Sequence, residues 1–367
     1  MSVEINGYDW SDLKHTWELQ FLQLAPSNAT DVLGELEGVD LSSASITEGY
    51  YTDTRVQAKL DYYDASRYRQ AFIQVRASVP EWGYSTILGT FMPTDDDVSL
   101  SGGSVKTSLS LESMLYAMDL QQHSAPWVVY QGASLQDVVD RISINTCRPW
   151  RNCSMNGYNY GSTVVYGSGE SYLSCLFDAC NQSNNRVDVE GDGTFTISPY
   201  ILPNRRTPVF TLDVTDERGI VSDGITRSSD YLSLPTECSV YYNANSENKT
   251  DVIYGYASHG GRFGHGERGY IISKVESVSE APAGGVAELN EKAQTLLANA
   301  STENVEWELT TEYMPVHAGD VGYIRGLTQD IEPYNGQQLV MIKNIELELE
   351  HMTMKLTLKS SNSLDEE

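Results

Sequence analysis

Apolar and polar residues alternate most regularly near the C-terminal end of the chain, from Gln337 to Lys359. A period of two places successive side chains on opposite faces of a strand, so one face of this stretch is apolar and the other is polar. The alternation is interrupted at Glu350-His351, a gap of the length of a tight turn. The pattern therefore predicts an antiparallel hairpin with one buried face. The positions expected to be buried are Ile345, Leu347, Leu349, Met352, Met354, Leu356 and Leu358.

Shorter alternating stretches fill residues 1–110 and predict several strands joined by polar turns. The alternation is strict in 56–62 and in 71–77, and the acidic run Asp95–Asp97 is expected to form a turn. Short strands at this spacing indicate a small barrel or sandwich. Further strands are predicted at 209–212, 238–242 and 251–254, and from Val305 onwards.

Helical spacing of apolar residues predicts helices at 111–118, from Ser134, at 171–181 and at 285–299. The helix from Ser134 is the best marked, because Ser134 and Asp137 have the spacing of a capping box. A loop is expected at 147–169, and Asp192-Gly193 between two alternating stretches is a strong hairpin signal.

The order of these elements predicts a mainly β fold with α+β insertions and three domains. The first is expected at 1–118 and the second, a compact α+β domain, at 119–203. The third is expected at 204–362, with an inserted helix-bearing element at about 243–302, and residues 363–367 form a tail.

The charge of the chain excludes several classes of partner. Its 367 residues include 51 acidic and 24 basic side chains, which gives a net charge of -27. An acidic surface repels phosphate groups, so specific binding to a nucleic-acid backbone or to anionic membranes is not expected. Tyrosine is common, at 23 residues against 7 phenylalanines, and it suits half-buried sheet faces and interfaces.

The cysteines do not have the spacing of a metal site. The N-terminus lacks the pattern of a signal peptide, so reduced thiols are expected. Zinc sites usually place paired ligands two to four residues apart, a spacing that Cys147, Cys153, Cys175 and Cys180 do not offer. A disulfide bond in the 147–153 loop is the alternative if the mature particle is extracellular.

The other candidates for chemistry also have simpler interpretations. The glycine-rich stretch Gly260–Gly266 has no Gly-Lys-Ser/Thr and no helix is expected after it, so a loop is preferred to a phosphate site. His259 and His265 flank that loop without a metal-binding motif, and Asp95–Asp97 lacks a second carboxylate placed across a cleft. We therefore predict no catalytic, cofactor-binding or metal-binding residue, no cofactor, and no enzymatic activity.

The C-terminal half carries a resemblance in the order of its elements. A helix and a strand lead to Asp192-Gly193, a second strand and the segment Pro199–Pro203. The later segments are Leu234–Val240, Gly266–Tyr270, the helix at 285–299, Met314–Gly322, Asn335–Gln337 and the terminal hairpin. In this order the segments resemble the tail-tip and baseplate hub proteins of tailed bacteriophages, a family shared with the N-terminal structural part of siphophage tail-associated proteins.

The resemblance implies a fold and an assembly. Members of that family combine two tube-type β-barrel domains, expected here at 1–118 and 204–362, with α/β hub domains. They form homotrimers whose barrels make a pseudo-hexameric ring that continues the tail tube and lets DNA pass during ejection. The implied partners are the distal tail protein ring, the tape measure protein, and tail fibre or receptor-binding proteins, with no membrane anchor.

The implied location is the tail tip of the virion, after assembly in the host cytoplasm. Many relatives carry a C-terminal peptidase, lysozyme or fibre extension, whereas this sequence ends shortly after the hairpin, so a structural adaptor without a hydrolase is expected. Two alternatives remain: a tail-tip protein that binds or cleaves glycans, and the spike base of a contractile injection system.

Overall fold

The structure is a computed structural model of the chain. It describes residues 4–5, 8–10, 16–25, 28–52, 54–63, 71–101, 104–146, 150–161, 163–214, 221–229, 234–243, 252–260, 264–278, 282, 284–300, 303–326 and 337–362. The chain divides into two compact units. The first unit comprises Met1–Gly224, Leu309–Leu327 and Met341–Thr357, and the second comprises Ile225–Glu308, Thr328–Val340 and Leu358–Glu367.

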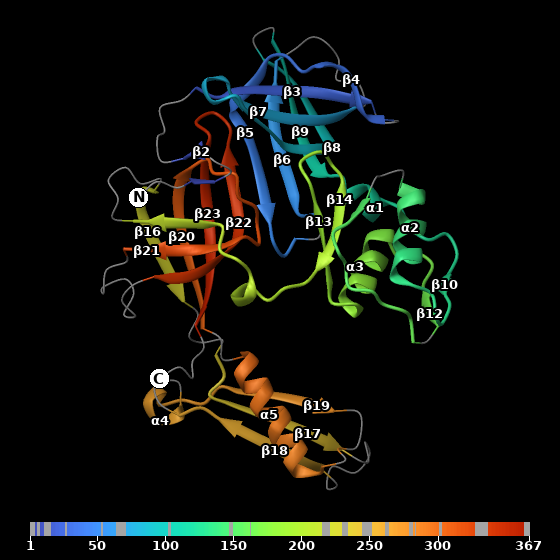
Figure 1. Cartoon of the computed structure of the whole chain (residues 1–367), viewed down its shortest axis with the longest axis vertical. Helices are drawn as coiled ribbons and strands as arrows, with labels where there is room; N and C mark the ends of the chain where they lie inside the picture. The colour runs from blue at the N-terminus through green and yellow to red at the C-terminus, as the bar shows by residue number, and fades with distance from the viewer. Residues whose placement is uncertain are drawn as a thin grey trace. The chain divides into compact units, whose positions relative to one another are not determined.

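The fold is mainly β, as the alternating sequence pattern predicts, and its strands form several sheets (Figure 1). The largest sheet has 13 strands, in the order β16-β20-β23-β22-β5-β6-β9-β8-β7-β3-β4, and β21 pairs with both β22 and β15. Their bounds are β3 Glu18–Ala25, β4 Asn28–Glu35, β5 Val39–Gly49, β6 Val56–Tyr62, β7 Phe72–Val79, β8 Tyr84–Ser101, β9 Ser104–Ser113, β15 Phe210–Asp213, β16 Val221–Ser229, β20 Glu303–Glu312, β21 Val321–Arg325, β22 Gln338–Glu348 and β23 Thr353–Asn362. A short pair, β1 (Glu4–Ile5) and β2 (Tyr8–Asp9), and two single turns of helix, η1 (Pro80–Trp82) and η2 (Pro203–Arg205), complete these regions.

The terminal hairpin predicted from the alternation is confirmed. Strands β22 and β23 flank a turn at residues 349–352, and all seven apolar positions expected to be buried are at most 5% exposed. Met352 closes the turn with a left-handed backbone, φ 51°. Strand β22 pairs antiparallel with β5, with Leu347 opposite Ile46, so a strand from the C-terminal part of the sequence lies beside one from its N-terminal part (Figure 1).

An α+β segment of the first unit has its own hydrophobic core. Its helices are α1 (Tyr116–Leu120), α2 (Leu135–Thr146) and α3 (Tyr172–Gln182), and its strands are β10 (Trp127–Val129), β11 (Trp150–Asn152), β12 (Val164–Tyr166), β13 (Asn185–Val189) and β14 (Phe195–Pro199). The predicted capping box of α2 is confirmed, because the Asp137 amide donates to Ser134 Oγ at 3.2 Å and the Ser134 amide donates to Asp137 Oδ2 at 3.1 Å. The apolar face of α2 is buried against α3 and the strands.

The Asp192-Gly193 turn is also confirmed. It joins β13 to β14, which pair antiparallel with Val187 opposite Ile197. Gly193 has φ 86°, a backbone conformation that favours glycine, and its amide donates to the Glu190 carbonyl at 2.8 Å.

Four local expectations are wrong. Leu111 lies in β9 rather than in a helix, because it continues the inward alternation of Leu109, and α1 begins only at Tyr116. Asp95–Asp97 form part of β8 and pair with β9 instead of making a turn. The expected loop at 147–169 contains β11 and β12, because parallel pairing with β14 and antiparallel pairing with β10 form these strands. Phe177 of α3 is only partly buried.

Asp95–Asp97 lie on a part of β8 that is not paired with β7. Strand β7 pairs with β8 only as far as Phe91, whereas β8 continues to Ser101 along β9. Asp95–Asp97 are exposed on this continuation. Carboxylates on a strand edge repel other strands, which protects such an edge from unwanted pairing.

The second unit contains a three-stranded sheet covered on one face by a helix. Strands β18 (Val252–Ser258), β17 (Glu237–Asn243) and β19 (Ser273–Val278) lie in that order, and the predicted fourth helix, α5, spans Val286–Ala300 (Figure 1). Gly255 lies against the backbone of α5, since a Cβ added there would come within 2.1 Å of the Leu289 carbonyl carbon.

Replacing Gly255 with alanine is expected to destabilise the second unit by about 1–3 kcal/mol, because α5 must move to make room for the new methyl group. Urea unfolding followed by circular dichroism measures the loss, and hydrogen exchange of the α5 amides locates it. Gly260→Ala is the matched control, because a Cβ at Gly260 meets no atom within 4 Å. Equal unfolding midpoints for the two variants would contradict the close packing of β18 on α5.

Candidate functional site

A cleft of the first unit lies beside the α+β segment. Cavities of about 640 Å³ and 540 Å³ lie in it, and both are lined by Arg55 and Arg186. The larger cavity is lined by residues of α3 and β13 together with Tyr50, Tyr51 and Arg55. The smaller cavity is lined by residues of β13 together with the loop from His317 to Gly319. A cleft that gathers arginines in a chain of net charge -27 is a natural candidate for a binding site.

Arg206 makes three hydrogen bonds within the protein. Its Nε donates to the Ile201 carbonyl at 2.8 Å, its Nη1 to the Gly319 carbonyl at 2.5 Å, and its Nη2 to the Tyr50 hydroxyl at 2.7 Å. The planar guanidinium therefore ties the chain after β14 to the loops that follow β5 and β20.

Arg186 contacts the same tyrosine. Its guanidinium lies 3.8 Å from the centre of the Tyr50 ring, within the range of a cation–π contact. Its Nε and Nη2 reach Asp188 Oδ1 at 2.7 Å and 2.5 Å. Gly319 has φ 98° and leaves room for this stack, since a Cβ there would come within 2.5 Å of the Tyr50 ring.

Arg55 holds the cleft from the side of the large sheet. It has a left-handed backbone, φ 63°, and its Nη1 donates to the Tyr50 carbonyl. Its Nε donates to the Val187 carbonyl at 3.1 Å, and its guanidinium lies 5.4 Å from the centre of the Phe177 ring.

We call Tyr50, Arg55, Arg186 and Arg206 the arginine–tyrosine joint. The arginines of this joint contact backbone carbonyls, Asp188, the Tyr50 hydroxyl and aromatic rings of the same chain. Donors used in this way hold two parts of the first unit together and are not available to an anionic ligand. The joint escaped sequence reasoning because its partners are far apart in sequence and are mostly backbone atoms.

A histidine on the rim of the cleft is coupled to a carboxylate. His317 Nδ1 lies 3.3 Å from Glu48 Oε2, and the Glu48 Oε1 atom accepts a 2.9 Å hydrogen bond from the Ala318 amide. The hydrogen bond to Glu48 raises the pKa of His317 to about 9, although 74% of the side chain is open to water. His317 is therefore protonated at neutral pH and pairs the loop after β20 with β5.

The cysteines do not form a reactive group in the described part of the chain. Cys175 and Cys180 are buried free thiols, and burial raises the pKa of each to about 12. Cys175 Sγ lies 3.4 Å from His123 Nε2, but burial lowers the pKa of His123, so this pair is a neutral thiol and a neutral imidazole. A nucleophilic cysteine needs the opposite shift. Cys153 is also free, and Cys147 lies outside the described residues.

The glycine-rich stretch differs from expectation in one respect. A four-residue helix, α4 (His265–Arg268), follows Gly264, so the expectation that no helix follows this stretch is wrong. Residues 261–263 lie outside the described part of the chain. His265 is exposed at the start of α4, and the His259 amide donates to the Thr236 carbonyl at 2.9 Å.

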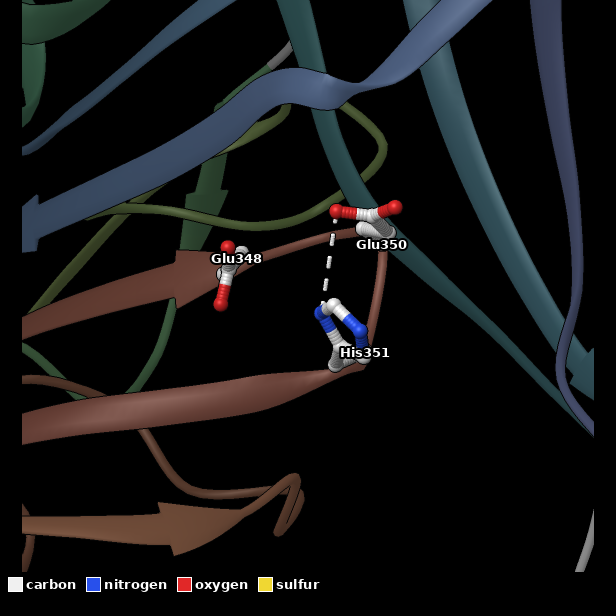
Figure 2. A group of neighbouring side chains, drawn as sticks. All are labelled: Glu348, Glu350 and His351. Carbon is white, nitrogen blue, oxygen red and sulfur yellow. Dashed lines mark ion pairs between the residues drawn. The ribbon is translucent and has the colours of Figure 1, made fainter.

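One group of described side chains has the atom types of a cation site. Glu348, Glu350 and His351 lie together at the terminal hairpin (Figure 2). His351 Nδ1 is 3.7 Å from Glu350 Oε2, and Thr353 Oγ1 donates to Glu348 Oε2 at 3.2 Å. All three members are exposed, so water competes for every ligand atom, and the group is adequately explained as the solvated end of a hairpin.

Among the helices of the described residues, none combines the length and the apolar character needed to cross a membrane.

Comparison with known proteins places the fold. No protein-family model matches the sequence, and no curated protein sequence does. Solved structures do match. The tail protein from Neisseria meningitidis MC58 has a TM-score of 0.58 and 14% identity, over 98% of this chain and 95% of that one. The 43 kDa tail protein of prophage MuSo2 from Shewanella oneidensis has a TM-score of 0.62 and 10% identity, over 94% and 98%.

A third similar structure is a chain of the Francisella PdpA-VgrG complex. Its TM-score is 0.56 and its identity 9%, over 96% of this chain and 54% of that one. The resemblance to phage tail proteins that the sequence suggested is thus confirmed at the level of the fold.

Replacing Arg206 with lysine is expected to lower the free energy of unfolding by about 1–3 kcal/mol, because lysine cannot make the three hydrogen bonds of the planar guanidinium. Chemical unfolding measures the change. The neighbouring exposed residue supplies the control, and Arg205→Lys is expected to change the free energy by less than about 0.5 kcal/mol. Equal changes in the free energy of unfolding for the two substitutions would show that Arg206 does not stabilise the arginine–tyrosine joint.

The pair of His317 and Glu48 predicts a pH dependence. A pKa raised in the folded chain means that the pair stabilises fully below the ordinary histidine pKa of about 6.5 and that this stabilisation is lost as the pH rises through about 9. Solvent limits its size to less than about 1 kcal/mol. The measurement is the free energy of unfolding of the wild type minus that of Glu48→Gln between pH 6 and 10. The free energy of unfolding of His317→Gln is expected to depend on pH as weakly as that of Glu48→Gln. A pKa of His317 near 6.5, measured by NMR, would refute the pairing.

Proposed function

We propose that the chain is a structural hub protein of a phage tail tip or baseplate. The observation that carries the proposal is the match to two tail proteins over nearly the full length of both chains in each comparison. A similarity that covers both chains end to end compares whole architectures rather than one common motif. In this function the chain connects the tail tube to tip or fibre proteins and is not an enzyme.

The proposed assembly is a homotrimer with two tube-type barrel domains in each chain. The first barrel comprises residues 1–118 and the second 204–362, on either side of the α+β hub domain at 119–203. The strand order supports this division, because within the large sheet the strands that come from residues 1–118 are neighbours, as are those that come from residues 204–362. Strands β17, β18 and β19 form their own sheet. Closure of the two sets into barrels, and of three chains into a pseudo-hexameric ring, is part of the proposal.

The charge of the chain suits a channel for DNA. With a net charge of -27, carboxylates facing the lumen repel the phosphate backbone, so DNA passes without binding. The proposed partners are the distal tail protein ring, the tape measure protein, and tail fibre or receptor-binding proteins, and the proposed location is the tail tip of the virion.

A second candidate is the spike base of a contractile injection system. The match to a chain of the PdpA-VgrG complex favours it, because that match covers 96% of this chain. Detection of the protein by mass spectrometry in purified phage particles supports the tail hub, whereas detection in a secretion apparatus supports the spike base. A glycan-binding or glycan-cleaving tail protein is the remaining alternative.

The hub proposal predicts that the purified full chain assembles into a complex of three copies. Native mass spectrometry gives the number of copies, and negative-stain images are expected to show a threefold ring with an open centre. The same preparation, incubated with bacterial cell wall, is expected to release no muropeptides and no reducing ends. A stable monomer that binds or degrades cell-wall glycan would overturn the proposal.

A further inference from the structure

The sheet of the second unit has one covered and one open face. Cys238 and Val240 of β17 are buried against α5, in a core that includes Leu289 and Ala293. Because successive side chains of a strand point to opposite faces, the residues that alternate with Cys238 and Val240 point away from α5. Helix α5 crosses one face only of these strands (Figure 1).

Pairing aligns tyrosines on the open face. Ser239 of β17 is opposite Tyr256 of β18 and Val275 of β19, and Tyr241 is opposite Tyr254. Paired residues share a face, so these side chains form adjoining rows. Tyr254 is 64% exposed, Val275 59% and Tyr256 46%. Adjoining exposed aromatic and aliphatic side chains on an ordered sheet are typical of an interaction surface.

This face is almost free of charge, unlike the chain as a whole. The outward positions of β18 are Val252, Tyr254, Tyr256 and Ser258. On β17 the outward carboxylate is Glu237, which accepts a 2.8 Å hydrogen bond from the Tyr256 hydroxyl and another from Ser273 Oγ. These hydroxyls lower the pKa of Glu237, so it stays ionised but engaged within its own sheet.

The two charged residues of β19 lie on the other side. Lys274 is opposite Cys238 and Glu276 is opposite Val240, so both lie on the same side of the sheet as α5, and they pair with each other at 3.4 Å. Apart from Glu237, the open face therefore presents uncharged side chains, mainly tyrosine, serine and valine.

The lack of charge decides between kinds of partner. A partner with a basic surface would be bound through carboxylates, which the chain carries in abundance elsewhere. A second copy of this chain brings a charge of -27 of its own, so it can approach closely only where carboxylates are few or engaged. Cores of protein interfaces are likewise rich in tyrosine and poor in charged residues.

We propose that the open face formed by Tyr241, Tyr254, Tyr256 and Val275 is a contact between copies of this chain. The inference rests on the proposed assembly into an oligomer and names the surface that joins its subunits. In a ring the contact is heterologous, so this face meets a different surface of the neighbouring copy.

The test uses the purified full chain with two pairs of substitutions. Tyr254→Ser with Val275→Ser removes the apolar part of the face and is expected to weaken association at least about tenfold, as measured by sedimentation velocity over a range of protein concentrations. The control is Tyr130→Ser with Val165→Ser, which removes a tyrosine and a valine of similar exposure, 71% and 59%, from the first unit. The control is expected to associate like the wild type.

Salt gives an independent measurement. Screening weakens the repulsion between acidic copies, so association through an uncharged face is expected to strengthen at least about threefold between 50 mM and 500 mM NaCl. A contact made through opposite charges weakens instead, and that result would overturn the inference.

The outcomes separate the inference from the proposed function. A wild type that stays monomeric at every concentration and salt overturns both. If the wild type assembles and the Tyr254/Val275 variant assembles as well as the control, the inference alone is overturned. If the variant is unfolded by circular dichroism, a photo-cross-linking amino acid at position 254 replaces it. Cross-linked dimers from position 254 but not from position 130 support the contact, and equal yields refute it.

Discussion

The pairing of β22 with β5 is the interaction on which the rest of the first unit depends. It places Leu347 opposite Ile46 and Asn344 opposite Gly49, so residues from opposite parts of the sequence become hydrogen-bonded neighbours. Strand β22 also pairs with β21. Through β5 it is connected to the strands that follow in the sheet, in the order β6, β9, β8, β7, β3 and β4. Closing so long a loop costs conformational entropy, which the buried face of the hairpin has to offset. The alternation from Gln337 to Lys359, interrupted only at the Glu350-His351 turn, supplies that face.

Local structure was predictable wherever one signal was sufficient. The capping box of α2, the Asp192-Gly193 turn and the alternation of the terminal hairpin each act within a few residues, and the structure contains all three. The failures share a cause. Leu111 and Asp95–Asp97 belong to strands because of partners elsewhere in the sheet, and β11 exists because β14 pairs with it in parallel. Periodicity describes a segment by itself, and these segments are defined by their neighbours.

The arginine–tyrosine joint was beyond prediction for a related reason. Arg55, Arg186 and Arg206 look like ordinary surface residues in the sequence, and they become structural only because Tyr50, Val187 and Gly319 bring a ring or a carbonyl to them. Backbone acceptors leave no trace in sequence. The same circumstance helps to explain how identities of 14% and 10% accompany a common fold, since alternation and backbone contacts tolerate many different side chains.

The β22–β5 pairing also has a consequence for how the protein is made. The α+β segment has its own core within one stretch of sequence, so it can fold while the rest of the chain is still being translated. The large sheet has no such option, because β5 waits for a strand that begins at Gln338. During most of synthesis the inner edge of β5 is therefore open, and translation itself sets the earliest moment at which the sheet, and any assembly built on it, is completed.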